Sequence, residues 1–209
     1  MQRTLPMARI ETVALPGCEA ITLGLINADF PTGPLPGEVM RNVLAKPAYW
    51  SLCWGSGLAL AQFILQDPSW IKGKSVVDLG SGSGVVAIAA AIAGAASVNA
   101  CDTDPDARLA TQVNANLNGQ SVKTGAELPE HCDLLLMADV LYDKQNLPLL
   151  KMAQKHAREV IVADSRVTSL PDPTYREIVK INALTYPNLG EFDEYGTAHV
   201  FHWRSNLDQ

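Results

Sequence analysis

The sequence predicts an α/β fold built on a doubly wound, mostly parallel sheet of seven strands. Short runs of β-branched and apolar residues alternate with amphipathic or alanine-rich stretches, as in a parallel sheet with helices on both faces. The last two predicted strands follow each other without an intervening helix, which indicates an antiparallel edge hairpin. A turn with three glycines, "VVDLGSGSGVV" at 76–86, joins the first strand of the alternating pattern to its helix.

The beginning of the chain departs from this alternation. Residues 1–36 are rich in Pro and Gly, and strand-like pieces at 11–15 and 20–26 flank the turn Pro16-Gly17. A helix is expected at 37–46. These elements form a predicted N-terminal extension that is part of a lid over the substrate.

The main domain, residues 47–209, contains the alternating pattern, and the N-terminal extension is residues 1–46. Pro105 marks the first turn of one helix, and Gly94 and Asn118-Gly119 mark the ends of two. The strands are expected at 74–79, 97–101, 122–124, 133–137, 159–163, 175–186 and 195–204, and the helices at 55–66, 85–93, 105–117 and 144–157.

The composition is that of a folded domain with an acidic surface. The 209 residues are 47% hydrophobic and 18% charged, which is enough for one large core. A net charge of −6 without a run of Lys or Arg argues against nucleic acid or an acidic membrane as a partner. No stretch of about 18 apolar residues could span a bilayer.

Cysteine and histidine usage indicates a reducing compartment and no metal. The four cysteines are far apart with no Cys-x-x-Cys pair, and the four histidines lack the spacing of a zinc site. The N-terminus has no apolar core of a signal peptide. We therefore expect a cytoplasmic protein, and we expect it to be a monomer.

The glycine turn contains Gly80, Gly82 and Gly84, which let the backbone turn sharply and a ligand approach closely. A dinucleotide-binding turn would need Gly or Ala where Val85 stands, and a P-loop would need Gly-Lys-Ser/Thr; the sequence has neither. Asp78, just before the turn, would repel a pyrophosphate but suits a cationic ligand. The turn therefore indicates a nucleoside that carries positive charge.

A second carboxylate follows the next predicted strand. Asp102, in "NACDTDP", lies beyond the carboxyl end of that strand, where a carboxylate can accept both ribose hydroxyls. The acid–glycine–acid arrangement fits S-adenosylmethionine, which has a sulfonium, an α-amino group and a free ribose but no phosphate. A glycine-rich turn alone could be a tight strand–helix junction, but the two acids favour a cofactor site.

The stretch from about Pro47 to Arg166 resembles the class I S-adenosylmethionine-dependent methyltransferases. More narrowly, it resembles the group that contains the electron-transfer-flavoprotein β-subunit lysine methyltransferases. The resemblance rests on "PAYWSLCWGSGLAL", the glycine turn, "NLNG", "ADVLYD" and "VIVADSR", of which the first and fourth are the specific motifs. It implies a Rossmann-like fold, a transferase that uses S-adenosylmethionine, and S-adenosylhomocysteine as product.

The resemblance also places Trp54 against the cofactor, and the adenine contact is expected from residues 125–128. The residues expected to contact the cofactor are Trp54, Asp78, Gly80, Gly82, Ser83, Asp102, Thr103, Glu127 and Ala138.

The motif "MADVLYD" follows the fourth predicted strand, where the transferred methyl group is expected. Asp139 can hold an amine by hydrogen bonds, and the face of Tyr142 can favour the incipient cation, so both are expected to be catalytic. Related protein-lysine methyltransferases carry an Asp-x-x-Tyr or Asp-x-x-Phe signature, which these two residues match. The alternative is that Asp139 caps the next helix and Tyr142 packs on the core. For Asp143, helix capping is the expected role.

The substrate entrance is expected at an aromatic wall. The resemblance places Tyr49 and Trp50 there, and with Tyr142 they are the expected substrate-binding residues. Asp164 and Arg166 could contact the substrate or pair with each other at a turn, and the pairing is the expected role.

Three functions stay open at this point. The first is protein-lysine N-methylation of a folded protein, such as electron transfer flavoprotein β-subunit or a ribosomal protein. The alternative is N-methylation of a small, nicotinamide-like amine. The third is a protein that binds the cofactor without transferring its methyl group.

Overall fold

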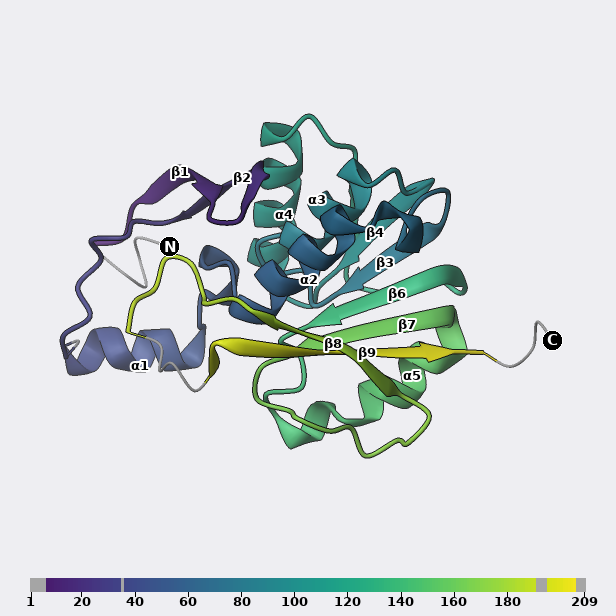
Figure 1. Ribbon diagram of the computed structural model, residues 1–209. Helices are drawn as coiled ribbons and strands as arrows, with labels where there is room; N and C mark the ends of the chain where they lie inside the picture. The colour runs from purple at the N-terminus through teal and green to yellow at the C-terminus, as the bar shows by residue number, and fades with distance from the viewer. Residues whose placement is uncertain (1–6, 35, 191–194, 206–209) are drawn as a thin grey trace.

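The computed structural model describes residues 7–34, 36–190 and 195–205. These residues form a seven-stranded sheet with helices on both faces and a separate two-stranded sheet near the N-terminus (Figure 1). The strand order of the large sheet is β5-β4-β3-β6-β7-β9-β8. Its strands are β3 (Ser75–Leu79), β4 (Ser97–Cys101), β5 (Lys123–Gly125), β6 (Cys132–Ala138), β7 (Ala157–Asp164), β8 (Arg176–Asn182) and β9 (Thr197–Arg204).

The predicted fold class is confirmed. Strands β3 to β7 pair in parallel, as the alternation with helices requires. Strand β9 is antiparallel to both β7 and β8, so the last two strands form the expected antiparallel edge. The order reverses direction between β3 and β6, and in open sheets of this type a ligand binds at the carboxyl ends of the strands beside such a point.

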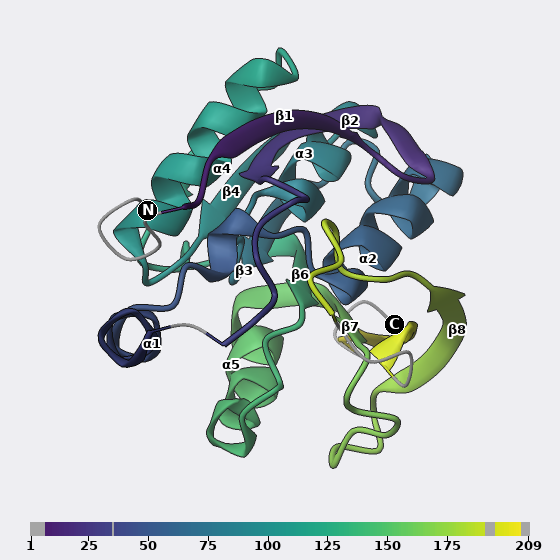
Figure 2. The ribbon, with the colours of Figure 1, turned by 90° about the vertical axis from the view of Figure 1, so that its left-hand side faces the viewer.

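Helices cover the two faces unequally. Figures 1 and 2 show α2, α3 and α4 on one face and α5 on the other. The central strand β6 supplies both cores: Leu134 and Leu136 pack toward α2 and α3, whereas Leu135 and Met137 pack toward α5. The helices are α2 (Gly55–Gln66), α3 (Val85–Ile92), α4 (Pro105–Leu117) and α5 (Pro148–His156).

The first part of the chain forms a hairpin and a short helix. Strands β1 (Ile10–Leu15) and β2 (Cys18–Ile26) pair antiparallel and lie over α4 (Figure 2). Helix α1 (Gly37–Ala45) follows, and single 3-10 turns lie at η1 (Tyr49–Ser51) and η2 (Pro68–Trp70). The expected elements are present, and the domain boundary at residue 46 stays a prediction.

Two predicted elements are wrong in their extent. The helix expected at 144–157 is a 3-10 turn, η3 (Lys144–Asn146), followed by α5, because Pro148 has no N–H to bond to the carbonyl of Lys144 four residues earlier. The strand expected at 175–186 ends at Asn182, and Tyr186 instead pairs with Cys53, far along the chain. Part of the connection expected between the last two strands, 191–194, lies outside the described residues.

Among the residues that the structure describes, no helix combines the length and the apolar character that crossing a membrane requires.

The first strand and its helix are linked by a buried carboxylate. Asp78 in β3 is 2% exposed, and its Oδ2 accepts the backbone N–H of Ala87 in the first turn of α3 at 3.0 Å. Burial raises the pKa of Asp78 to about 7, although the hydrogen bond from Ala87 opposes that shift. The carboxyl group thus satisfies a donor at the helix start that has no partner within the helix.

Truncation of a buried side chain in the central strand β6 tests the core. Leu135 is fully buried between β6 and α5, and Leu135→Ala is expected to lower the free energy of unfolding by about 2–5 kcal/mol because it leaves a cavity. Leu109, 61% exposed on α4, is the matched control, and Leu109→Ala should change it by less than about 0.5 kcal/mol. Urea unfolding of both variants measures the difference, and equal losses would contradict the assigned core.

Asp78 predicts a specific pH dependence of stability. Its pKa is about 7 in the folded chain, against 3.8 for an ordinary aspartate, so between these values the folded chain binds the extra proton and stability falls as pH rises. Asp78→Asn removes this dependence while its amide oxygen still accepts the Ala87 N–H. The free energy of unfolding of Asp78→Asn should therefore rise relative to wild type by about 2 kcal/mol from roughly pH 5 to pH 7, at about 1.36 kcal/mol per unit. Denaturant unfolding across that range measures it, and a difference independent of pH would refute the buried, protonated carboxyl group.

Candidate active site

The glycine turn between β3 and α3 requires its glycines. Gly80, Gly82 and Gly84 have φ values of +78°, +51° and +85°, in the left-handed region that other residues rarely adopt. A Cβ on Gly80 would lie 2.5 Å from Cγ1 of Val140, and one on Gly84 would lie 2.9 Å from Cγ2 of Thr111. The turn is therefore wedged between the loop after β6 and the helix α4, with its backbone close to both.

Asp102 closes the turn from the neighbouring strand. It follows β4 directly, and its Oδ2 accepts the N–H of Gly82 at 3.0 Å while its Oδ1 accepts that of Asp104 at 2.9 Å. Thr103, which follows, is exposed, and Arg108 donates from its guanidinium to the carbonyls of Asp102 and Thr103. The structure thus brings the predicted acid to the predicted turn, at the same edge of the sheet.

The other expected cofactor residues lie in varied surroundings. Ser83 is buried in the glycine turn, and Ala138 is the half-buried last residue of β6. Glu127 is exposed in the loop after β5, and its carbonyl accepts the thiol of Cys101 at 3.2 Å. Asp78 lies beneath the turn, bonded to α3. Direct contact of these four side chains with a cofactor stays a prediction.

Asp139 joins the end of β6 to the start of α2. Its Oδ2 accepts the N–H of Ser56 at 2.9 Å and its Oδ1 accepts the Ser56 hydroxyl at 2.6 Å. The N-cap residue of α2 is Trp54, whose side chain makes no capping bond, so the Asp139 carboxylate supplies the cap from a distant segment. Asp139 therefore does cap a helix, but the helix is α2, which precedes it in the chain, and not the helix after it as the alternative expects.

The backbone and the ionisation of Asp139 are both unusual. Among the residues that the structure describes, Asp139 is the one non-glycine residue with a positive φ, +52°. This conformation is unfavourable for residues other than glycine and is kept only where surrounding contacts hold it. Burial raises the pKa of Asp139 to about 6. The negative charge of Asp164 also raises this pKa, whereas the hydrogen bonds from Ser56 and Gly57 lower it. At neutral pH the carboxylate is therefore largely ionised and held in one orientation.

Three aromatic rings lie on the two segments that Asp139 joins: Tyr142 follows Asp139 by three residues, and Tyr49 and Trp54 precede its partner Ser56. The ring of Tyr49 lies 5.8 Å from that of Trp54 in an edge-to-face contact and 5.9 Å from that of Tyr142. The indole N–H of Trp54 donates to the Tyr49 carbonyl at 2.8 Å, which fixes the wall. Tyr49 and Tyr142 are 49% and 53% exposed, so the wall opens to solvent, whereas Trp50 is partly buried. The alternative that Tyr142 packs on the core does not fit its exposure.

Two acidic residues near the site serve the backbone. Asp143 accepts the N–H of Gln145 at 2.9 Å and so caps η3, which is the capping role expected for it. Asp164 is 1% exposed and accepts backbone N–H groups of Leu141 and Arg166. The expected pairing of Asp164 with Arg166 thus exists through the backbone, while the Arg166 guanidinium lies over the ring of Tyr195, 5.1 Å from its centroid.

Two further residues of the site carry no clear signal in the sequence. Ser56 lies within the motif "PAYWSLCWGSGLAL", but its partner Asp139 is 83 residues away, a distance that no local pattern reveals. Asn114 on α4 contacts the glycine turn and has no signal beyond its proximity to "NLNG".

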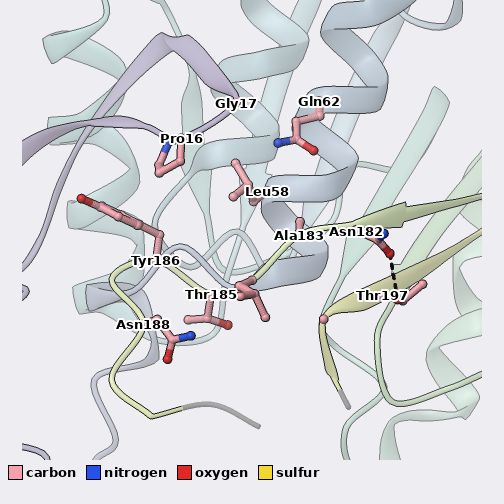
Figure 3. Close-up of a pocket in the computed structure, with 12 residues that line it drawn as sticks. Pro16, Gly17, Leu58, Gln62, Asn182, Ala183, Thr185, Tyr186, Asn188 and Thr197 are labelled. Carbon is pink, nitrogen blue, oxygen red and sulfur yellow. Dashed lines mark hydrogen bonds between the residues drawn. The ribbon is translucent and has the colours of Figure 1, made fainter. Parts of the chain in front are cut away.

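A groove lies beside α2, away from Asp139 and the aromatic rings. It has a cavity volume of about 780 Å³ and runs between the hairpin turn at Gly17, Gln62 of α2 and the segment after β8 (Figure 3). Figure 3 shows the Thr197 hydroxyl bonded to the side-chain oxygen of Asn182, at 2.9 Å. None of its described lining residues is among the predicted site residues.

The described residues contain no group of three or more His, Cys, Asp or Glu side chains that could hold a metal ion.

Comparisons with known proteins show similarity in sequence and in fold to methyltransferases. The family model of ribosomal protein L11 methyltransferase (PrmA) matches residues 62–163. The electron transfer flavoprotein beta subunit lysine methyltransferase of Danio rerio is 31% identical over 171 residues, which are 76% of this chain and 66% of that protein. The chain spans 39–66% of the lengths of the four relatives of this name from Danio rerio, mouse, rat and human.

Solved structures share the fold. The ribosomal protein L11 methylase of Lactobacillus delbrueckii subsp. bulgaricus superposes with a TM-score of 0.53 at 23% identity, covering 70% of this chain and 77% of that one. Magnesium protoporphyrin IX methyltransferase from Synechocystis PCC 6803, solved with bound SAM, gives 0.54 at 17% identity, covering 83% and 86%. Together with the sheet order and the glycine turn, these matches show that the chain has the fold of the class I S-adenosylmethionine-dependent methyltransferases and is similar in sequence to the electron transfer flavoprotein beta subunit lysine methyltransferases.

Proposed function

We propose that this chain transfers a methyl group from S-adenosylmethionine to the side-chain amine of a lysine in a folded protein. The single observation that carries the proposal is the joint placement of Asp139 and the aromatic wall at the end of β6, beside the glycine turn. The names of two kinds of similar protein also contain a protein substrate, electron transfer flavoprotein beta subunit and ribosomal protein L11. Because the chain spans only part of those relatives, the acceptor is part of the proposal.

The residues present fit an S-adenosyl group. A Cβ on Gly82 would meet nothing nearer than the carbonyl of Gly80, at 4.0 Å, so an adenosine can lie close to the backbone of the turn there. The Asp102 carboxylate lies at that turn, and the free lone pairs of its oxygens suit ribose hydroxyls. When bound, the cofactor supplies an electrophilic methyl group on a sulfonium.

The chain's own residues act on the acceptor amine. Asp139 carries a negative charge at neutral pH and is held by Ser56, so it can accept a hydrogen bond from the lysine nitrogen and orient it. A lysine nitrogen must lose a proton before it can attack, and the carboxylate with its pKa of about 6 can take that proton or pass it to solvent. The faces of Tyr49 and Tyr142 favour the cation that forms on nitrogen.

The opening of the wall to solvent favours a protein over a small molecule as acceptor. Tyr49 and Tyr142 are half exposed, so a lysine that protrudes from a protein surface can lie against their solvent-facing sides. A small nicotinamide-like amine is the second candidate, because the same carboxylate and rings would hold an enclosed amine.

We further propose a cytoplasmic location and a monomer without nucleic-acid partners. Cys18, Cys53, Cys101 and Cys132 are all buried and unpaired, as in proteins of reducing compartments. The acidic net charge of −6 argues against nucleic acid.

A methyl-transfer assay tests the acceptor class. The purified chain is incubated with S-adenosylmethionine labelled in its methyl group and with a cell lysate, with purified electron transfer flavoprotein and with ribosomal proteins. Label is expected on lysine side chains of one or a few proteins, located by peptide mass spectrometry. Label that appears only on small amines, with proteins unlabelled, would instead support the second candidate and reject a protein acceptor.

The aromatic wall gives a matched pair of variants. Tyr142→Phe keeps the ring face and should keep kcat/KM for the acceptor within about threefold. Tyr142→Ala should lower kcat/KM about 10- to 30-fold, which corresponds to about 1.4–2 kcal/mol, the upper part of the range for a cation near a ring. Steady-state kinetics at saturating cofactor measure both. Equal losses in the two variants would show that the hydroxyl, not the ring face, is what the reaction uses.

A further inference from the structure

One face of α4 is lined by polar side chains that the proposed reaction does not use. Thr111, Asn114 and Asn118 follow each other at spacings of three and four, so they lie on one side of the helix. Thr111 is 0% and Asn114 is 1% exposed. The Thr111 hydroxyl lies 3.2 Å from the carbonyl of Gly82 and 3.1 Å from the hydroxyl of Ser81, so this face of α4 forms hydrogen bonds to the glycine turn.

Asn114 bonds to two different parts of the molecule. Its Nδ2 donates to the carbonyl of Ser83 in the glycine turn at 2.8 Å, and its Oδ1 accepts the N–H of Gly24 in β2 at 2.8 Å. The reverse orientation would place its NH2 group against the N–H of Gly24 and its oxygen against the carbonyl of Ser83. The hairpin and the turn therefore select a single orientation of this amide.

Asn118 bonds to the hairpin without reaching the turn. Its Oδ1 accepts the N–H of Thr22 at 2.9 Å, and its Nδ2 donates to the carbonyls of Thr22 at 2.6 Å and Asn114 at 2.7 Å. The amide thus imitates a neighbouring strand and satisfies the outer edge of β2, which has β1 as its partner on the other side only. Figure 2 shows the hairpin passing over α4.

We propose that Asn114 is a positioning residue for the cofactor-binding turn, and that the N-terminal hairpin supports the cofactor site by fixing the Asn114 amide. The turn has three glycines and so many accessible backbone conformations, and a bond to the carbonyl of Ser83 restricts them to the one that leaves the turn open to an adenosine. The inference rests on the proposed binding of S-adenosylmethionine at this turn. It gives the hairpin a function in cofactor affinity besides its part in the fold.

The two asparagines provide a matched experiment. Asn114→Asp, within α4, and Asn118→Asp, at its C-cap, are the same isosteric change four residues apart, and each keeps the acceptor toward the hairpin but loses the donor. Only the first loses a bond to the glycine turn. Calorimetric titration with S-adenosylhomocysteine gives Kd for wild type and both variants, and steady-state kinetics give KM for S-adenosylmethionine and kcat. Thermal unfolding reports the loss of stability in each variant.

A positioning role predicts a split between the two variants. Asn114→Asp should raise Kd and KM by about tenfold or more, equivalent to about 1.4 kcal/mol, with kcat at saturating cofactor within about threefold of wild type. Asn118→Asp should leave Kd within about twofold of wild type, even with a similar drop in Tm. Asn114→Ala, which removes the donor without burying a charge, should weaken binding in the same direction and replaces Asn114→Asp if that variant does not fold.

Two results would overturn the inference. Wild-type Kd in a folded Asn114 variant would show that the bond to Ser83 does not set cofactor affinity. Equal weakening by Asn118→Asp at equal loss of Tm would show that both residues act through stability alone. Either result leaves the proposed function in place, whereas failure of the wild-type chain to bind S-adenosylhomocysteine would overturn the proposed function and the inference together.

Discussion

The site depends on carboxylates at the ends of neighbouring strands that accept backbone N–H groups. Strands β4, β3, β6 and β7 are adjacent in the sheet, and each has an aspartate at or next to its carboxyl end. The loops that leave these strands expose N–H groups that neither helix nor sheet satisfies, and buried donors without partners are costly. The pairs are Asp78 with Ala87, Asp102 with Gly82 and Asp104, Asp139 with Ser56, and Asp164 with Leu141, Arg166 and Val167.

This arrangement gives the site its charge and its rigidity at once. Burial raises the pKa of Asp78 to about 7 and of Asp139 to about 6, so the two carboxyl groups sit near neutrality rather than near their ordinary range. Asp78 is enclosed and serves the helix start, whereas Asp139 lies by the aromatic wall and is held by Ser56 in a left-handed conformation. Carboxyl groups at the strand ends therefore have two roles: Asp78 stabilises the start of α3 beneath the glycine turn, and Asp139 is the proposed reactive group beside it.

Much of the fold follows from local sequence signals, and much of the site does not. The glycine turn, Pro105 and the alternation of apolar runs predict the parallel sheet because each acts within a few residues. The helix predicted to begin at Lys144 begins instead at Pro148. The residues before Pro148 have a helical pattern, but the missing N–H of the proline interrupts the hydrogen bonds that would join them to α5. The bond from Ser56 to Asp139 spans 83 residues, so no window of sequence contains both partners. The same holds for Asn114 and Gly24, 90 residues apart, so the contact of the hairpin with α4 is visible only in the folded chain.

The glycine turn and its strand-end acids are proposed to form a preorganised site for S-adenosylmethionine, and a crystal structure of the chain with S-adenosylhomocysteine would test this. The adenosine is expected along Gly80 and Gly82, with both ribose hydroxyls within hydrogen-bond distance of Asp102 and the backbone of the turn as it is here. A ligand bound elsewhere, such as in the groove between Gly17 and Gln62, or a turn that must refold to admit it, would contradict a preorganised site.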